Sequence, residues 1–583
     1  MSNKKSNSAL LSTLIKEFDG INTGAKYKHP LGSSQVVNFR IDENGSLRKR
    51  CGFKHLASLP YHINAVWYGK LEKYNRLIIL AGYYIYEYRN STLREIGHID
   101  DIDHEQASFF FYLGNLYLID GHSLFTIRSN SISKAVCYAP LIGKDWVCGW
   151  KGEIYEKRNL LSDFVRITYV ADNAAIKYLC VTDTVKEVVA LYRNGELLSP
   201  NEYTIDNTNQ LIMLNEAAPG DAFELTVRYP TLNSTASNDI KTAINCTILG
   251  GMEGKQPHFW NTQAGNVLYV GKQLSAEQIS ASQIDLPCVP IYVTDDDILK
   301  VGNGNHKIMA LAKHFGRTLI FTENDVWRTS EEGQSKLESN PSDTKLSDIQ
   351  TLTINTSIGV SSTGGVILAD NDPISIGKSA LFRWTANTDE LDEQNAYSIS
   401  SEIQSDIPEE FWTIGSLFFD KYHNEIYFYA KEYDKTWIWN KSSKKWVRFE
   451  GLEPEIFFEY GEKVAFTGGN DIYVFDESQT TDLRDSYESD IIARFYSNPI
   501  DFGTFEDKHI TSISASSEGG EIDFNLYFDE NITPDISLRA SPEKTRHIIR
   551  KRISGKRFKC IQLEIIAGGQ NRQTLHSLKL EAR

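Results

Sequence analysis

The sequence lacks the features of membrane-spanning and secreted proteins. No apolar run approaches the roughly 20 residues that a membrane helix needs. The segment Met1–Ser8 is polar and is not followed by the apolar stretch of a signal peptide. We therefore expect a soluble protein that is not exported by the standard route and does not insert into membranes.

Cysteine is sparse and shows no ligand spacing. Only seven cysteines occur among 583 residues, and no CxxC or His/Cys pattern of a metal site is present. An odd number of unpatterned cysteines is typical of reduced, mostly buried thiols in a protein that is assembled in a reducing cytoplasm. We expect no disulfide framework.

The sequence also lacks the short motifs of common enzyme classes. It contains no GxSxG, HExxH or GxxxxGK[ST] motif, and no GxGxxG in a strand–helix context. Carboxylates are plentiful, so a glycosidase pair is not excluded by counting, but nothing marks one pair over another. We expect no enzyme activity and no cofactor, and we name no catalytic, cofactor-binding or metal-binding residue.

The chain has no excess of positive charge. It carries 77 acidic and 61 basic residues, which gives a net charge of −16. A protein that grips nucleic acid through its phosphates needs a basic face, so this balance argues against such a role. It remains compatible with a passage through which DNA slides, because an acidic wall prevents sticking.

The chain is rich in aromatic residues and in one repeated phrase. It has 29 Tyr, 28 Phe and 10 Trp, which favour sheets together with Val, Ile and Thr. In the repeated phrase, two β-branched or aromatic runs flank a Gly, Asn or Asp break, which is the pattern of a β-hairpin. The copies are Arg76–Asn90, Asn115–Ser129, Arg317–Ser330, Glu425–Asn440 and Lys463–Ser478.

The spacing of the copies predicts a β-propeller-like ring. The first two copies begin at 76 and 115 and the last two at 425 and 463, close to the roughly 40–50 residues of a four-stranded blade. Imperfect copies near Val267–Val270 and Ile374–Trp384 bring the number to about seven blades. A single hairpin cannot bury its apolar face alone, so the repeats must pack against one another.

Two stretches whose sequence differs from the repeat predict β-sandwiches. One has period-2 strands around Asn194-Gly195 and Pro219-Gly220 turns, and it interrupts the repeat. The other follows the last copy. Near the N-terminus, apolar residues at helical spacing in Ser8–Phe18 predict a short helix. The expected domains are an arm with this helix (1–34), the first part of the propeller (35–144), an inserted β-sandwich (145–235), the second part of the propeller (236–480) and a C-terminal β-sandwich (481–583).

Acidic clusters raise the question of calcium. His98–Glu105 and Asp295–Asp297 gather carboxylates, and oxygen-rich loops can hold that ion. The Asp/Asn/Gly spacing and the distal Glu of a calcium-binding loop are absent, so we interpret both clusters as exposed acidic loops. Glu331–Asp348 is expected to be a long exposed acidic loop.

One basic run and one aromatic pair are also candidates for binding. In Arg546–Lys559, basic residues alternate with apolar ones, so we expect a solvated strand face or a surface for an acidic neighbour rather than a phosphate site. Trp437 and Trp439 are better explained by blade packing than by stacking on a sugar.

Beyond these patterns, most of the chain resembles the propeller-containing tail nozzle, or packaged-DNA stabilisation, proteins of tailed bacteriophages. The inserted and C-terminal modules occur in the same order, and the entry sequence Asp-x-x-Gly-x-Leu-Arg-x-Arg-x-Gly is similar. Its residues here are Asp42, Gly45, Leu47, Arg48, Arg50 and Gly52. The resemblance brings no catalytic residues with it.

The resemblance implies a structural protein of the virion tail, assembled in the host cytoplasm. It would form a ring, usually a hexamer, that extends and closes the DNA channel. Its partners would be further copies of itself, other tail proteins such as an adaptor or tail fibre, and genomic DNA that passes without sequence-specific binding. The alternatives are a tail-tip protein that binds a host receptor or glycan and, more distantly, a propeller glycoside hydrolase.

Overall fold

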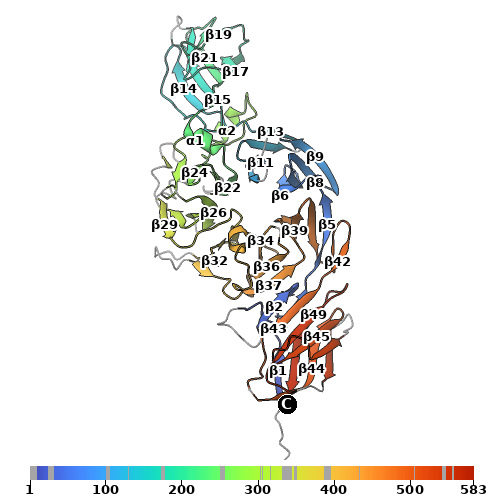
Figure 1. Cartoon of the computed structure of the whole chain (residues 1–583). Helices are drawn as coiled ribbons and strands as arrows, with labels where there is room; N and C mark the ends of the chain where they lie inside the picture. Colours follow the sequence, from blue (N-terminus) through green and yellow to red (C-terminus); the bar gives the residue numbers. More distant parts are fainter. Residues whose placement is uncertain are drawn as a thin grey trace, which may run out of the picture. The chain divides into compact units, whose positions relative to one another are not determined.

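The structure is a computed structural model of the whole chain, and strands make up nearly all of its regular structure (Figure 1). Three short helices are described: α1 (Thr235–Ile240), α2 (Ala276–Ser282) and α4 (Phe411–Ile414). Among the described residues, no helix is long and apolar enough to cross a membrane. The structure describes residues 10–23, 32–99, 106–128, 130–172, 177–249, 256–302, 304, 306–314, 317–330, 345–346, 351–385, 396–431, 433–504, 506–540, 546–553 and 557–583.

The chain divides into two compact units, which are described separately. The first unit contains both ends of the chain, and the second contains most of its middle. Their bounds are Met1–Tyr68, Tyr88–Leu93 and Asn355–Arg583 for the first unit, and Gly69–Glu87 and Arg94–Ile354 for the second.

The repeated structure is a four-stranded antiparallel sheet, as the propeller prediction requires. Four such sheets precede Thr356. They are β6 (Ile63–Leu71), β7 (Tyr74–Ala81), β8 (Tyr84–Arg89) and β9 (Thr92–His98); β10 (Ser108–Tyr112), β11 (Asn115–Ile119), β12 (Leu124–Arg128) and β13 (Ser131–Lys134); β22 (Asn245–Leu249), β23 (Gln256–Trp260), β24 (Val267–Val270) and β25 (Ile298–Lys300); and β26 (Ile308–His314), β27 (Arg317–Thr322), β28 (Val326–Thr329) and β29 (Thr351–Asn355).

Three more four-stranded sets lie in the first unit, and the last one takes its outer strand from near the N-terminus. They are β30 (Val366–Ala369), β31 (Asp372–Ile376), β32 (Leu381–Trp384) and β33 (Ala396–Ser398); β34 (Ser416–Asp420), β35 (Glu425–Tyr429), β36 (Lys435–Asn440) and β37 (Lys445–Glu450); and β38 (Ile456–Tyr460), β39 (Lys463–Gly468), β40 (Asp471–Asp476) and β5 (Gly52–Ser58). The described residues therefore contain seven blade-like sets, and each of the five clear copies of the repeat spans the second and third strands of its set.

Neighbouring sets pack through their first strands. In the second unit β10 contacts β22 and β22 contacts β26, while in the first unit β30 contacts β34 and β34 contacts β38. Packing of first strands against first strands is how propeller blades are arranged, because each blade buries its faces against the next. The fold is therefore all-β and of the β-propeller type.

The inserted sandwich has two sheets and a core of its own (Figure 1, cyan to green). Ile167 and Phe223 of one sheet pack with Leu179 and Ile212 of the other. The Asn194-Gly195 turn has positive φ at both residues, as predicted for a tight hairpin. The strands are β14 (Leu141–Val147), β15 (Phe164–Val170), β21 (Ala222–Arg228), β17 (Glu187–Arg193) and β18 (Glu196–Leu197) in one sheet, and β16 (Tyr178–Cys180), β20 (Leu211–Leu214) and β19 (Tyr203–Asp206) in the other.

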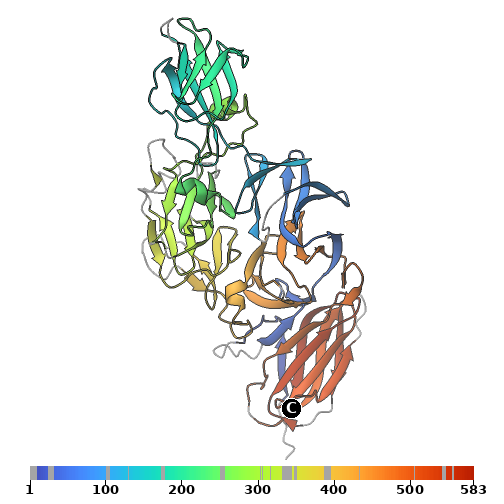
Figure 2. The same cartoon turned by 45° about the horizontal axis from the view of Figure 1, so that its top comes forward.

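The C-terminal sandwich is also present, but it includes strands from the N-terminal segment. One sheet is made from β43, β49, β45 and β46, and the other pairs β50 with β44, β4 and β1 (Figure 2, red to orange and blue). The bounds are β1 (Leu11–Ile15), β2 (Ser33–Val37), β3 (Phe39–Ile41), β4 (Leu47–Lys49), β41 (Thr481–Leu483), β42 (Glu488–Asp490), β43 (Ala493–Ser497), β44 (Lys508–Glu518), β45 (Ile522–Phe528), β46 (Ile536–Ala540), β47 (His547–Arg552), β48 (Arg557–Phe558), β49 (Ile561–Ala567) and β50 (Thr574–Ala582).

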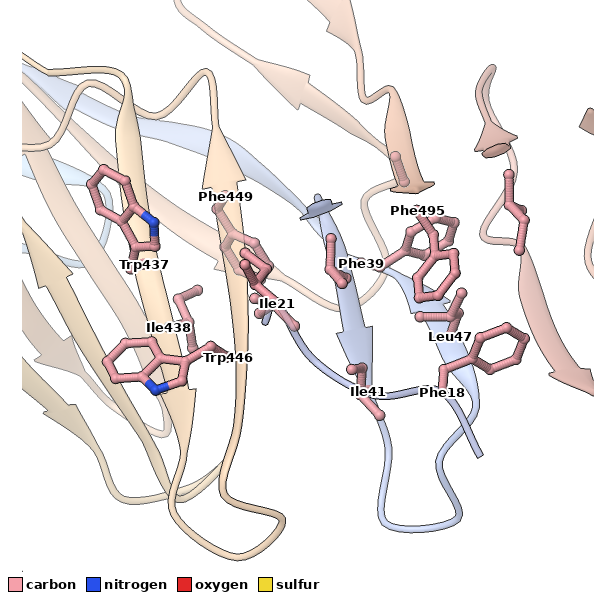
Figure 3. Close-up of a cluster of buried hydrophobic side chains, with 14 of the residues drawn as sticks. Phe18, Ile21, Phe39, Ile41, Leu47, Trp437, Ile438, Trp446, Phe449 and Phe495 are labelled. Carbon is pink, nitrogen blue, oxygen red and sulfur yellow. The ribbon is translucent and has the colours of Figure 1, made fainter. Parts of the chain in front are cut away.

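Strand β2 joins the C-terminal sandwich to a blade. It pairs in parallel with β37 and antiparallel with β43, which creates a continuous nine-stranded sheet. One hydrophobic core accordingly extends through this region: Phe18, Phe39 and Phe495 belong to the same cluster as Trp446 and Phe449 (Figure 3).

Two predictions about the N-terminal region are wrong. Leu11–Ile15 is the strand β1, not part of a helix, and it pairs with β50. Leu14, which the helical pattern placed on an apolar face, is about half exposed at 48%. The predicted start of the propeller at residue 35 is also too early, because β2 pairs with β43, and the β3–β4 hairpin pairs through β4 with β50. In both cases a partner far away in sequence decides the structure.

Candidate functional site

The resemblance motif folds into the β3–β4 hairpin and the strand that follows it. The Asp42 carboxylate accepts hydrogen bonds from the backbone amides of Asn44 and Ser46 at 3.0 and 2.8 Å, which closes the turn. Gly45 has φ of +76°, and a Cβ there would lie 2.8 Å from the Cα of Glu17. The glycine thus allows both the turn and the close approach of the N-terminal segment.

Arg50 of the motif is a buried charged residue, with 1% of its surface exposed. Its Nη1 and Nη2 donate to the two carboxylate oxygens of Asp482 at 2.8 and 2.6 Å. Nε donates to Asn38 Oδ1 at 3.0 Å, and further bonds reach the carbonyls of Cys51 and Glu450. A planar guanidinium suits this site, because a bidentate carboxylate and three other acceptors converge on one group.

Gly52 ends the motif at a point where two backbones meet. A Cβ on Gly52 would lie only 1.7 Å from the carbonyl oxygen of Thr481, so no larger residue fits without moving β41. The Gly52 amide donates to the carbonyl of Gln479. The motif therefore fixes the chain where β5 meets the segment that leads out of β40.

Arg40 forms the second ionic contact of the hairpin. Its guanidinium lies 3.1 Å from Glu425 and donates to the hydroxyl of Tyr427 at 2.9 Å. Burial by itself would lower the pKa of Arg40, but the negative charge of Glu425 raises it above the ordinary value. Burial also raises the pKa of Glu425, and the positive charge of Arg40 opposes that effect.

Glu477 extends the contact to the C-terminal sandwich. Its carboxylate lies 3.8 Å from Arg40 and pairs with Arg572, which precedes β50. We call Arg40, Arg50, Glu425, Glu477 and Asp482 the hairpin clamp. These five residues connect the β3–β4 hairpin with β35, with the end of β40 and with β41, all within the first unit.

A group of possible metal ligands shares Glu425 with the clamp and also contains Asp420 and His423. The Asp420 carboxylate accepts from the His423 ring at 2.6 Å and from the backbone amides of Tyr422 and His423. Although burial alone would raise the pKa of Asp420, hydrogen bonding from His423 and the charges of His423 and Arg40 lower it. Because these atoms already have protein partners and Arg40 opposes a second cation, we interpret the group as part of the ion-pair network.

A cleft of about 440 Å³ opens next to Arg50. Part of its charged lining is paired: Arg448 lies 2.8 Å from both carboxylate oxygens of Asp406 and 2.9 Å from Glu450. Arg50 and Asp482 form the bidentate pair described above. The cleft therefore presents a polar surface in which these positive and negative charges are matched.

The two acidic clusters predicted from the sequence have different outcomes. Residues 100–105 of the His98–Glu105 cluster lie outside the described residues. Asp297 is buried, accepts two hydrogen bonds from Thr294 and lies 3.7 Å from Lys272, whereas Asp296 pairs with Lys157. Burial raises the pKa of Asp297 to about 6. The prediction of an exposed loop is therefore wrong for Asp297, because the carboxylate caps a buried turn.

The other sequence candidates are placed more simply. Strand β47 pairs with β44 and is exposed along nearly its whole length, which confirms the predicted solvated face within Arg546–Lys559. Trp437 is fully buried, donates to Asp406 at 2.8 Å and packs 4.9 Å from Phe411, as the packing interpretation predicted. Nearly all of the Glu331–Asp348 loop lies outside the described residues.

Sequence reasoning did not identify the hairpin clamp as a site. Arg50 was named only as part of the entry sequence and Arg40 was not named at all, and Asp482 lies 432 residues from Arg50 along the chain. No local pattern reveals such a partner. The useful signal was an arginine among strand residues that are otherwise buried, since a buried arginine needs a carboxylate.

No protein-family model matches the chain, and none of the curated proteins matches it. Among solved structures, it is similar to YCF48 from Cyanidioschyzon merolae (8% identity, TM-score 0.35, covering 73% of this chain and 98% of that one). It is also similar to the AfRom2 CNH domain (9% identity, TM-score 0.33, covering 73% of this chain and 99% of that one). A further similar structure is the WD40 domain of SCAP from fission yeast (9% identity, TM-score 0.29, covering 73% of this chain and 94% of that one). These scores are too low to support any conclusion about function.

Proposed function

We propose that this chain is a structural component of a bacteriophage tail, of the nozzle type that extends and closes the DNA channel. One observation carries the proposal. The residues that resemble the entry sequence of nozzle proteins are the residues that lock the N-terminal segment into the last blade and the C-terminal sandwich. A motif with this role serves mechanical coupling, not catalysis.

The first unit is built to resist separation of its parts. Pulling the C-terminal sandwich away from β37 would break the backbone pairing of β2 with β37 or with β43 and expose the shared core. It would also separate the buried pair of Arg50 and Asp482. A part that holds a pressurised genome requires this kind of cohesion.

The remaining features of the proposal follow from charge and resemblance. With a net charge of −16, the chain would let DNA pass without holding it. Its partners would be further copies of itself in a ring, an adaptor or tail fibre protein, and the passing genome. Its place would be the tail of the virion, after assembly in the host cytoplasm.

The test uses the phage that encodes the chain, with its gene interrupted and supplied again from a plasmid. Without the protein we expect particles that package DNA and then lose it, measured as nuclease-sensitive DNA in purified particles. The wild-type gene should restore retention, an Arg50→Ala gene should restore it poorly, and an Arg228→Ala gene should restore it fully. Full retention in particles that lack the chain would contradict the proposal.

A tail-tip protein that binds a receptor is the second candidate function. The observation that favours it is an exposed aromatic surface on the inserted sandwich, where Trp150 is 71% exposed.

A further inference from the structure

The inserted sandwich presents three large apolar side chains to solvent in the segment that links β14 to β15. Trp150 is 71% exposed, Tyr155 59% and Ile154 51%. They border a hollow of about 420 Å³, lined from Lys144 to Val147 and from Trp150 to Tyr155. A surface tryptophan this exposed, beside a second ring and above a hollow, indicates a binding surface.

The backbone beneath these rings is held in place. The buried Trp146 donates its indole N–H to the carbonyl of Glu153 at 2.9 Å, and a Cβ on Gly152 would lie 2.5 Å from the Trp146 ring. The amide of Trp150 donates to the carbonyl of Val147, and that of Tyr155 to the carbonyl of Ile142, both at 2.9 Å. The rings are therefore presented on a fixed support, which reduces the entropy lost on binding.

The charges around the hollow identify the kind of ligand. Lys144 and Lys151 are balanced by Asp145 and Glu153 within the same short segment. The Lys144 ammonium lies 5.0 Å from the centre of the Tyr155 ring, which helps to hold that ring in position. A phosphate or nucleic acid would need an excess of positive charge, and a basic peptide an excess of negative charge. The matched set instead suits a neutral ligand with many hydroxyl groups.

We infer that this surface, made of Trp150, Tyr155 and the charged residues around them, is a binding site for a neutral carbohydrate. The C–H groups on one face of a sugar ring carry slight positive charge, which complements the negative face of an exposed indole or phenol ring. The hydroxyl groups of the sugar would bond to the carboxylates and ammonium groups at the rim, where charged partners give the stronger hydrogen bonds. Protein interfaces, by contrast, lose charged residues at their cores, whereas here charges alternate with the rings.

This site is independent of the nozzle function proposed above, because it uses no residue of the hairpin clamp, and it gives a ligand class to the second candidate function. A carbohydrate site would add recognition of a cell-surface or capsule glycan to a structural part. It would also be consistent with the inserted sandwich having a core separate from the blades.

The test applies the purified full chain to an array of neutral oligosaccharides of one to six hexose or N-acetylhexosamine units, followed by titration of the strongest binders by calorimetry. We expect binding by the wild type, a loss of tenfold or more in affinity for Trp150→Ala, a smaller loss for Tyr155→Ala and partial retention for Trp150→Phe. Tyr487→Ala is the matched control, because Tyr487 is 56% exposed on the β41–β42 hairpin. Unfolding curves should be the same for all variants, since these side chains bury little surface.

Each other outcome overturns the inference. No binding on the array excludes the site, and equal binding by wild type and Trp150→Ala places any sugar site elsewhere. Sedimentation velocity completes the test. If Trp150→Ala reduces self-association of the chain while no sugar binds, the surface is an interface between copies and not a carbohydrate site.

Discussion

The two sandwiches of this chain have similar strand patterns but different relations to the structure around them. The inserted sandwich keeps its strands in two sheets of its own and packs Phe223, Leu225 and Leu179 in a separate core. The C-terminal sandwich shares a nine-stranded sheet with a blade and shares its core with that blade. One is a self-contained module, and the other is a fused part. The difference is consistent with the separate roles proposed above, recognition for the first and cohesion for the second.

The largest expected difference between the two sandwiches appears when each is expressed alone. Residues 141–229 should fold cooperatively, because β14, β15 and β21 are neighbours in one sheet and the core is complete. Residues 491–583 should remain unfolded or aggregate, because β1, β2 and β4 are missing from their sheets. Circular dichroism and amide dispersion in NMR spectra measure both. Independent folding of the second fragment would contradict the fused relation.

Matched core substitutions should differ in how far their effects spread. Phe495→Ala and Phe223→Ala each remove a buried ring and should each lower the free energy of unfolding by about 3–5 kcal/mol. Hydrogen exchange followed by mass spectrometry should show faster exchange in β34–β37 as well as β43 for Phe495→Ala. For Phe223→Ala the change should stay within residues 141–229. Faster exchange outside residues 141–229 would show that the core of the inserted sandwich is coupled to the rest of the chain.

Matched arginine substitutions should sharpen the contrast between buried and exposed pairs. Arg50→Ala leaves Asp482 buried without its partner and should lower the free energy of unfolding of the first unit by about 3–5 kcal/mol. Arg228→Ala breaks a pair with Asp163 in which the side chains are 44% and 23% exposed, and should cost about 1 kcal/mol or less. Urea unfolding at pH 7 measures both effects. Similar losses of stability for the two variants would contradict the stabilising role of the hairpin clamp.

The smallest expected difference is in acid sensitivity. Hydrogen bonds from Lys579 and Ser512 and the charge of Arg550 lower the pKa of Glu581, in the C-terminal sandwich, to about 2. Because the folded-state pKa lies below the unfolded value, this stabilisation is present above about pH 4.3 and is lost as the pH falls towards 2. Glu581→Gln should therefore cost about 1–2 kcal/mol at pH 7 and progressively less below pH 4.

The control for acid sensitivity is Glu187→Gln, at an exposed position of β17 in the inserted sandwich. It should change stability by no more than about 0.5 kcal/mol at any pH. Unfolding by urea at a series of pH values compares the two variants. A Glu581→Gln effect that stays constant from pH 7 to pH 2.5 would contradict the role given to this carboxylate.

The hairpins could be predicted from the sequence because their signals are local. The extended runs and turn residues that specify each hairpin lie next to one another in the sequence. Examples are the Asn194-Gly195 turn, the β44 strand at Lys508–Glu518 and the five repeated segments. The partners of β1, β2 and β5 could not be predicted, because those strands pair with segments hundreds of residues away. For Leu11–Ile15 this distant pairing also overrode a helical pattern.

For the candidate site, too, local features could be predicted from the sequence and distant partners could not. The motif around Asp42 and Gly45 was visible and could be read as a turn, but its ionic partners were not. Trp150 lay at the edge of the predicted sandwich, in a stretch with Gly149 and Gly152 that breaks the two-residue alternation of the strands. Only its exposure in the folded chain distinguishes it from the buried Trp146.

We propose that this chain closes the DNA channel of a phage tail, and cryo-electron microscopy of intact particles can show whether it does. We expect density for several copies that form a closed ring at the end of the tail, with the DNA channel along the ring axis. The first unit of each copy should be part of that ring. Particles that lack the chain, or that carry it only as a peripheral appendage away from the channel, would contradict the claim.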